Sequence, residues 1–255
     1  MKKFCAHLSF LLLPIVLFCL WEYGAEVALI DVRFFSRPSL IWQEWIKSLQ
    51  SGLLIRHLSV TLKEAFWGLL FGSVFGTATG LFLAVNRRIG NLLLPFFAGL
   101  NGLPKLALAP LLIIWFGIGI SSKAIIAGTM VYFVFTFHLY TAYQNVDVEL
   151  LNSVKLLGAN RRQLIRLVIW PSCLPWFLTG LRTGVGMAFS GAIVGEYIGA
   201  SCGLGWLIND AGGRYDMTCV LYCVLTLIVL IMIFDFGIRL LEQSLLRWRR
   251  PRTSL

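Results

Sequence analysis

Residues 217–234 read MTCVLYCVLTLIVLIMIF, a run without a charged side chain. A helix needs about 20 mostly apolar residues to cross the hydrocarbon core of a bilayer, so this run predicts a membrane span rather than a core helix of a soluble domain. The whole chain is 58% hydrophobic and only 13% charged, against roughly 45–50% and about 25% in an average soluble domain. Such a chain cannot hide its apolar surface in water.

Similar apolar runs recur along the chain, and they predict an all-α polytopic membrane protein with about six transmembrane helices. We expect a single transmembrane domain over residues 1–255, with spans at 8–30, 58–85, 91–118, 122–144, 172–199 and 217–240. Residues 31–57 are too polar to cross. Because they contain Trp42 and Trp45, and tryptophan prefers the membrane–water interface, we expect them at the periplasmic surface.

The beginning of the chain imitates a secretory signal peptide, since Lys2 and Lys3 precede an apolar stretch, Leu8 to Leu20. The apolar sequence continues to Ile30 without a clean small-x-small cleavage site. This length favours a retained first span over a cleaved peptide.

The net charge of +10 comes from short basic clusters between the apolar runs. Arg87 and Arg88 follow one span, and the tail 247–252 follows the last. The positive-inside rule explains such clusters better than a nucleic-acid partner does. We therefore expect a multi-pass membrane protein with both termini and residues 145–171 in the cytoplasm. The basic residues left outside would be Arg33, Arg37, Lys47, Arg56, Lys63, Lys123 and Arg214.

No catalytic or metal-binding constellation is visible in the sequence. The cysteines show neither CxxC nor Cys/His spacing, and none of His7, His57 and His138 stands at ligand spacing from another histidine or acid. The sequence predicts no metal site and no enzyme active site.

Two spans carry glycine at every fourth position, which lets helices approach closely in a bilayer. We expect these glycines to be helix contacts, against the alternative that they reflect only the frequent glycine of membrane helices. The ladders are Gly68, Gly72, Gly76 and Gly80 in the second span, and Gly191, Gly195, Gly199 and Gly203 in and after the fifth.

The segment 145–171 carries the functional prediction. It is basic and partly apolar, and as two short helices broken at Gly158 it would present a surface for docking another protein. The alternative is an amphipathic helix lying on anionic lipid. The candidate docking residues are Asn152, Ser153, Val154, Lys155, Leu156, Leu157, Gly158, Ala159, Asn160, Arg161, Arg162 and Pro171.

This segment resembles the cytoplasmic loop of type I permeases of binding-protein-dependent ABC importers, which reads EAA, three residues, Gly, nine residues, Ile-x-Leu-Pro. Gly158 takes the glycine position, Val168 the isoleucine position and Trp170-Pro171 the Leu-Pro position, whereas residues 152–154 read Asn-Ser-Val in place of Glu-Ala-Ala. The blocks 104–119 and 195–207 are similar to the subfamily that imports nitrate, sulfonates and taurine.

The resemblance implies a transport subunit of the bacterial inner membrane. Two permease copies, expected to be identical, would form the pore. Two cytoplasmic ATPase subunits would grip the loops and use ATP and Mg, and a periplasmic or lipid-anchored binding protein would deliver the solute. This chain has no Gly-x-x-x-x-Gly-Lys-[Ser/Thr] loop, so no cofactor is expected on it. A nitrate-, sulfonate- or taurine-like anion is the favoured solute, and thiamine precursors or other small aromatic compounds are the alternative.

Ionisable side chains inside the bilayer usually face a cavity or a partner, because a charge there costs on the order of 3 kcal/mol. The candidates are Lys105, Arg182, Glu196 and Asp235. We expect Asp235 to pair with Arg239 one helical turn later. Arg182 and Glu196 lie about 21 Å apart on one helix, so each is a candidate pathway-lining residue, or else an anchor near its end of the span.

A secondary transporter driven by an ion gradient is the rival hypothesis, since it would also need intramembrane charges and glycine-broken helices. It would not need a docking loop, and no repeated half is visible in this chain.

Overall fold

The computed structural model describes residues 16–246, and this part of the chain is built from helices joined by short turns. Four of its helices are long and apolar enough to cross a membrane, or five if one bent pair is a single span. The all-α polytopic prediction is confirmed. Of the predicted first span, residues 8–15 lie outside the described part, as do Lys2, Lys3 and the basic tail 247–252.

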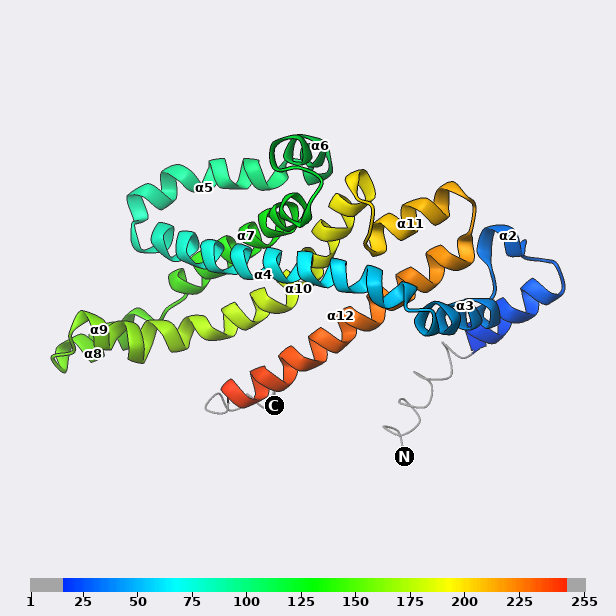
Figure 1. Ribbon diagram of the computed structural model, residues 1–255. Coiled ribbons are helices and arrows are strands. Elements are labelled where there is room, and N and C mark those ends of the chain that lie inside the picture. Colours follow the sequence, from blue (N-terminus) through cyan, green and yellow to red (C-terminus); the bar gives the residue numbers. More distant parts are fainter. Residues whose placement is uncertain (1–15, 247–255) are drawn as a thin grey trace, which may run out of the picture.

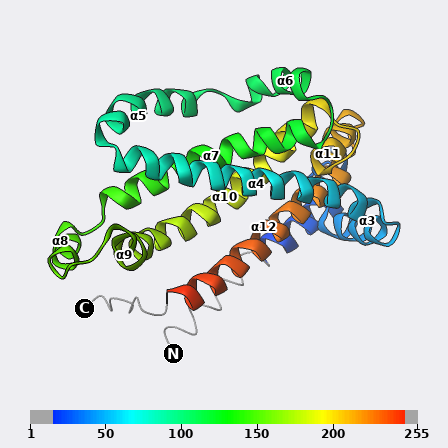
Figure 2. The ribbon, with the colours of Figure 1, turned by 60° about the vertical axis from the view of Figure 1, so that its left-hand side comes forward.

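The centre of the protein is a bundle of three helices, α4 (Leu53–Val85), α7 (Ile120–Gln144) and α10 (Trp170–Gly199). They run side by side in both views (Figures 1 and 2). α12 (Met217–Leu245) packs against α10, and the short helix α11 (Leu204–Gly213) fills the angle between them. The pair α8 (Val148–Leu156) and α9 (Arg161–Leu164) lies at the opposite end of the bundle from α11 (Figure 1).

Small residues let α4 and α7 approach until backbone meets backbone. A Cβ added at Gly72 would lie 2.6 Å from the carbonyl oxygen of Gly128, and one at Gly76 would lie 2.5 Å from that of Tyr132. On α10, a Cβ at Gly191 would lie 2.5 Å from the Cα of Ala127. The structure places glycines of both ladders, namely Gly68, Gly72, Gly76, Gly80, Gly191, Gly195 and Gly199, against neighbouring helices.

The predicted span 91–118 is not one continuous helix. The chain forms α5 (Arg87–Gly102) and α6 (Lys105–Phe116), which are bent by 88° at the break between them. Pro104 has no backbone N–H and disfavours a helical conformation at Leu103, so the helix ends there. In Figure 1, α5 and α6 arch over α4 and α7.

The fifth span begins earlier than residue 172. α9 continues through a π-helical turn, Ile165–Ile169, into α10, so an unbroken helical segment runs from Arg161 to Gly199. Pro171 lies in the first turn of α10, and wide π turns typically accommodate such irregularities within a helix. The last third of the predicted loop 145–171 is therefore helix.

The polar segment 31–57 holds α2 (Val32–Phe35), α3 (Pro38–Gln50) and the first turn of α4. α3 packs on α12, where the Trp45 indole nitrogen donates a hydrogen bond to Thr226 Oγ1 at 3.0 Å. Trp42 is 61% exposed. One of the two tryptophans therefore fixes α3 to the bundle, and the other faces outward.

Candidate functional site

The α8–α9 segment forms a separate projection at one end of the bundle (Figure 1). Asp147 caps α8 by accepting hydrogen bonds from the backbone nitrogens of Glu149 and Leu150, at 2.8 and 3.3 Å. Gly158 ends the helix with φ +82°, a conformation that side-chain-bearing residues rarely adopt. The first short helix and the break at Gly158 are present as predicted, whereas the second helix, α9, is the beginning of the long segment that continues into α10.

A capping box starts α9. The Asn160 side chain accepts from the Gln163 backbone nitrogen at 2.9 Å, while the Gln163 side chain accepts from the Asn160 nitrogen at 2.8 Å. Both bonds satisfy N–H groups that would otherwise lack a partner at a helix start. The tip between the two helices is therefore a defined turn.

The tip presents apolar side chains to the outside. Leu156 is 89% exposed and Leu157 86%. Basic residues surround them, and among the described residues Lys155, Arg161 and Arg162 form no ion pair. Of the other predicted docking residues, Asn152, Ser153, Gly158 and Asn160 are exposed, and Val154, Ala159 and Pro171 are half-buried.

At the other end of the bundle, the fully buried carboxylate of Glu196 joins three helices. Its Oε1 accepts a hydrogen bond from Thr61 Oγ1 on α4 at 2.6 Å. Its Oε2 accepts from the backbone nitrogen of Gly205 on α11 at 2.6 Å. The Thr61 hydroxyl in turn accepts from the nitrogen of Leu204 at 2.9 Å.

The turn between α10 and α11 closes over this carboxylate. Gly203 has φ +123°, and a Cβ there would lie 2.6 Å from Glu196 Oε2. His57 Nδ1 lies 3.0 Å from the oxygen and 3.1 Å from the nitrogen of Gly203, and the imidazole stacks on Trp206 with 5.3 Å between ring centroids. Only a glycine leaves room for the turn to fold this closely onto the acid.

Two further ionisable residues complete this cluster. Glu64, on α4, is 2% exposed, and its Oε2 has no hydrogen-bond partner among the described residues. Lys123, on α7, is 1% exposed and donates a hydrogen bond to the carbonyl oxygen of Ile118. Both lie close enough to Glu196 for electrostatic interaction. The ionisable side chains of this cluster thus lie inside the helix bundle.

Lys123, which the charge count assigned to the outer side of the membrane, is packed between helices and is not a surface charge. Glu64 and Thr61 were not recognised as cluster members either. The sequence did contain a signal for Glu64 and Lys123. Both stand within or at the edge of apolar runs, where an ionisable residue needs a partner.

Arg182 is held by α12. Its Nε donates to Asp235 Oδ1 at 2.8 Å, and Asp235 Oδ2 accepts from Arg239 Nε at 2.8 Å. A second acid, Glu242, lies 3.9 Å from an Arg182 nitrogen. The predicted pair of Asp235 and Arg239 is confirmed, and Arg182, expected to need water, lipid or a neighbouring helix, finds its partner on that helix.

Among residues 16–246, no three or more His, Cys, Asp or Glu side chains are arranged to hold a metal ion.

Known proteins share this architecture. A family model described as "Binding-protein-dependent transport system inner membrane component" matches residues 68–247. The riboflavin transport system permease protein RibX of Chloroflexus aurantiacus is 33% identical, over 92% of this chain and 89% of that one. The putative aliphatic sulfonates transport permease protein SsuC of Bacillus subtilis is 30% identical, over 94% and 87%. The formylaminopyrimidine transport permease protein ThiX of Halalkalibacterium halodurans is 31% identical, over 99% and 100%.

The fold is also that of a solved importer. An inward-facing structure of the MetNI methionine ABC transporter aligns with a TM-score of 0.68 at 20% identity, over 76% of this chain and 96% of that one. A helical, multi-pass fold with these relatives defines the permease subunit of an ABC importer. The chain belongs to the family of binding-protein-dependent transport system inner membrane components.

The family confirms several predictions at once. The chain is a multi-pass inner-membrane permease of the type I fold, it is a transport subunit and not an enzyme, and ATP hydrolysis takes place on a separate subunit.

Proposed function

We propose that the α8–α9 tip is the surface through which this permease is driven by its ATPase. The observation that carries this proposal is the pair of exposed leucines, Leu156 and Leu157, at the end of a capped, rigid turn. Exposed apolar side chains rimmed by basic residues are typical of a protein docking site. In this proposal residues 145–171 lie in the cytoplasm together with both chain ends.

The same proposal assigns the remaining partners. Two copies of this permease form the pore, two ATPase subunits that use ATP and Mg bind the tips, and a periplasmic or lipid-anchored binding protein docks at the α11 end. A rigid-body movement of the ATPases then reaches the spans through the continuous helix that begins at Arg161. Arg182 and Glu196 serve this movement by holding helices together, since both are engaged within one protomer.

A double replacement at the tip tests the docking role. The variant with Leu156→Asp and Leu157→Asp should insert normally but lose co-purification of the ATPase and ATP-driven uptake, because two carboxylates cannot be buried unpaired in an apolar socket. Tyr215→Asp is the matched control: Tyr215 is 74% exposed at the α11 end, and its replacement should leave ATPase binding intact. Unchanged co-purification in the double variant contradicts the proposal.

Orientation has its own test. A cysteine introduced at Ala159 should resist an impermeant thiol reagent added to intact cells and react once the membrane is opened. Labelling from outside intact cells would place the tip on the periplasmic side and contradict the proposal. Uptake that continues without ATP hydrolysis but stops when the ion gradient is dissipated would support the secondary-transporter alternative, which none of the named relatives favours.

For the solute, we propose a small anion. Two relatives are named for sulfonate-type solutes, namely the aliphatic sulfonates permease of Bacillus subtilis and the taurine permease of Escherichia coli. Two others are named for riboflavin and formylaminopyrimidine. Thermal-shift measurements on the partner binding protein with taurine, ethanesulfonate and riboflavin separate the two classes. Stabilisation by riboflavin alone would refute the anion.

A further inference from the structure

The break between α5 and α6 is unusual for a membrane segment. Leu103 and Pro104 interrupt the helix inside an otherwise apolar stretch, and no side chain caps the start of α6. Non-helical backbone at membrane depth is tolerated only where it is packed in protein or lines a water-filled cavity, because lipid offers no hydrogen bonds. Since Leu103 and Pro104 are exposed in this protomer, they face either water or a partner.

Lys105 stands directly after this break. Its ammonium group donates to the backbone oxygen of Asn101 and, at 3.1 Å, to the Asn101 side-chain oxygen. It also lies 5.5 Å above the centre of the Phe133 ring. Among the described residues, no Asp or Glu forms an ion pair with it. A lysine within a span that lacks an acidic partner ordinarily marks the path of a solute or ion.

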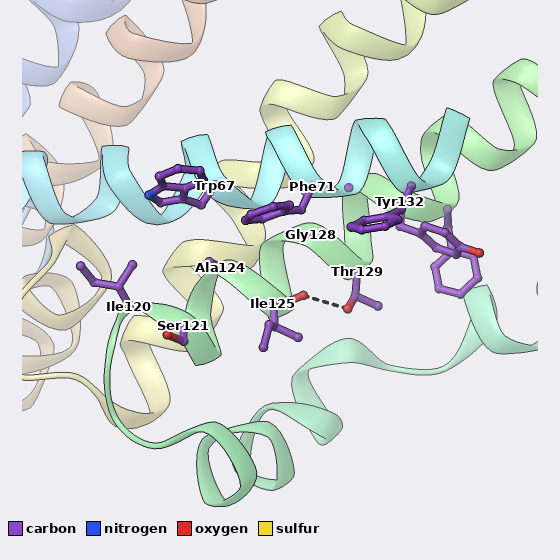
Figure 3. A pocket seen from close by; sticks show the side chains of 12 residues that line it. Trp67, Phe71, Ile120, Ser121, Ala124, Ile125, Gly128, Thr129 and Tyr132 are labelled. Atoms are coloured by element: carbon purple, nitrogen blue, oxygen red, sulfur yellow. Dashed lines mark hydrogen bonds between the residues drawn. The ribbon is translucent and has the colours of Figure 1, made fainter. Parts of the chain in front are cut away.

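A cavity of about 780 Å³ lies between α4 and α7 (Figure 3). Phe133 is part of its wall and is also the ring beneath the Lys105 ammonium. Trp67, Phe71 and Tyr132 line the same space. The volume is in the range of small-molecule sites, which combine mostly apolar walls with a few polar anchors. The Lys105 ammonium and this cavity thus share Phe133 as a common neighbour.

We propose that Lys105 makes the α5–α6 break an anion-binding step of the translocation pathway, which takes a sulfonate, nitrate or carboxylate group. The inference rests on the proposed function, and it adds a residue and a charge preference to the pathway. Lys105 donates two hydrogen bonds to Asn101, and an ammonium group has three donors, so one remains for the solute. The aromatic wall contacts the apolar part of the molecule.

The bland alternative is that Lys105 only closes the last turn of α5 through its bonds to Asn101. Two substitutions separate the roles. Lys105→Gln keeps a hydrogen-bond donor for the turn but removes the charge, and Lys105→Arg keeps the charge. A capping role tolerates the glutamine, whereas an anion site requires the cation.

The experiment uses the assembled transporter in membranes with Leu103→Cys as a reporter at the break, and the parent without this cysteine gives the background. Negatively and positively charged methanethiosulfonate reagents are compared after normalising to their rates with a free thiol. With Lys105 present, the anionic reagent should be favoured about five-fold or more, since a unit charge within about 8 Å is poorly screened. Lys105→Arg should keep this preference, and Lys105→Gln should abolish it.

A solute competition completes the test. Ethanesulfonate should slow labelling of the reporter in the Lys105 protein, relative to chloride at equal ionic strength, and should have no effect with Lys105→Gln. A reporter that neither reagent labels, a charge preference that survives Lys105→Gln, or the absence of competition overturns the inference. Because ATPase co-purification is measured on the same samples, loss of the docking function would be seen separately from loss of the anion site.

Discussion

The hydroxyl of Thr61 offers the sharpest test of the buried cluster, because it joins α4 to both α10 and α11. It donates to the Glu196 carboxylate at 2.6 Å and accepts from the Leu204 nitrogen at 2.9 Å. Thr61→Val replaces the hydroxyl by a methyl group of similar size. The cavity stays filled, and only the hydrogen bonds are lost.

The expected effect follows from what the valine leaves unpaired. The Leu204 N–H loses its acceptor and one oxygen of Glu196 loses its donor, in a site where both Thr61 and Glu196 are 0% exposed. A buried polar atom without a partner costs about 1 to 3 kcal/mol, and more if charged, so the total is about 3 to 5 kcal/mol. For a chain of this length that corresponds to a fall in Tm of roughly 6 to 20 °C.

Thr61→Ser is the matched control, since it keeps the hydroxyl and removes one methyl group. It should lose about 1 kcal/mol. The assay is the loss of folded transporter on heating at one fixed scan rate, because unfolding in detergent is irreversible. Hydrogen exchange at Leu204 and Gly205 gives a local measurement and should accelerate in the valine variant alone. Equal Tm and equal exchange in the two variants would refute the assigned role of the hydroxyl.

Two further outcomes follow from the helix contacts. Gly72→Ala should lower the stability of the protein by about 1 to 3 kcal/mol, because the new Cβ meets a backbone oxygen of α7 that cannot move aside. Gly99→Ala is the control and should be neutral or stabilising, since a Cβ there has nothing within 4 Å. The same thermal assay checks both variants. Asp235→Asn should weaken the α10–α12 contact more than Arg239→Gln does, since Asp235 bonds both Arg182 and Arg239. A lower Tm for Arg239→Gln than for Asp235→Asn would contradict this ranking.

Local patterns were enough to predict much of the fold. Apolar length located the long helices, because a span is a property of one continuous segment. The position of Gly158 predicted the break between α8 and α9, since a left-handed residue at a helix end is most often glycine. The exposure of Leu156 and Leu157 also follows from local sequence, as both lie at that break.

Pro104 was also a local signal for the bend, but the high hydropathy of the surrounding stretch favoured one continuous span. Averaged over the stretch 91–118, apolar residues favour one span, and the average does not register a single proline or the 88° angle it permits. The π turn before α10 was beyond prediction from local sequence, since a wide turn depends on the packing around it.

The buried cluster could not be predicted from the sequence, for a different reason. The bonds that join α4 to the rest of the cluster link residues more than 100 positions apart, such as Thr61 with Glu196 and His57 with Gly203. No local period encodes these pairs. Sequence reasoning could place Glu196 within a span and require a partner for it, but which helices supply the partner is decided only when the bundle forms.

Glycine ladders and polar clusters have different roles in the packing of such a bundle, since the first permit close approach and the second fix the register. Along α4 a glycine recurs every four residues from Gly68 to Gly80, so sliding α4 by one turn would still bring a glycine to most of its contacts with α7. The same slide would carry Thr61 about 6 Å away from the carboxylate of Glu196 and leave buried donors and acceptors unpaired. The ladder permits close approach, and the register of α4 is fixed by the hydrogen bonds that only one position can make.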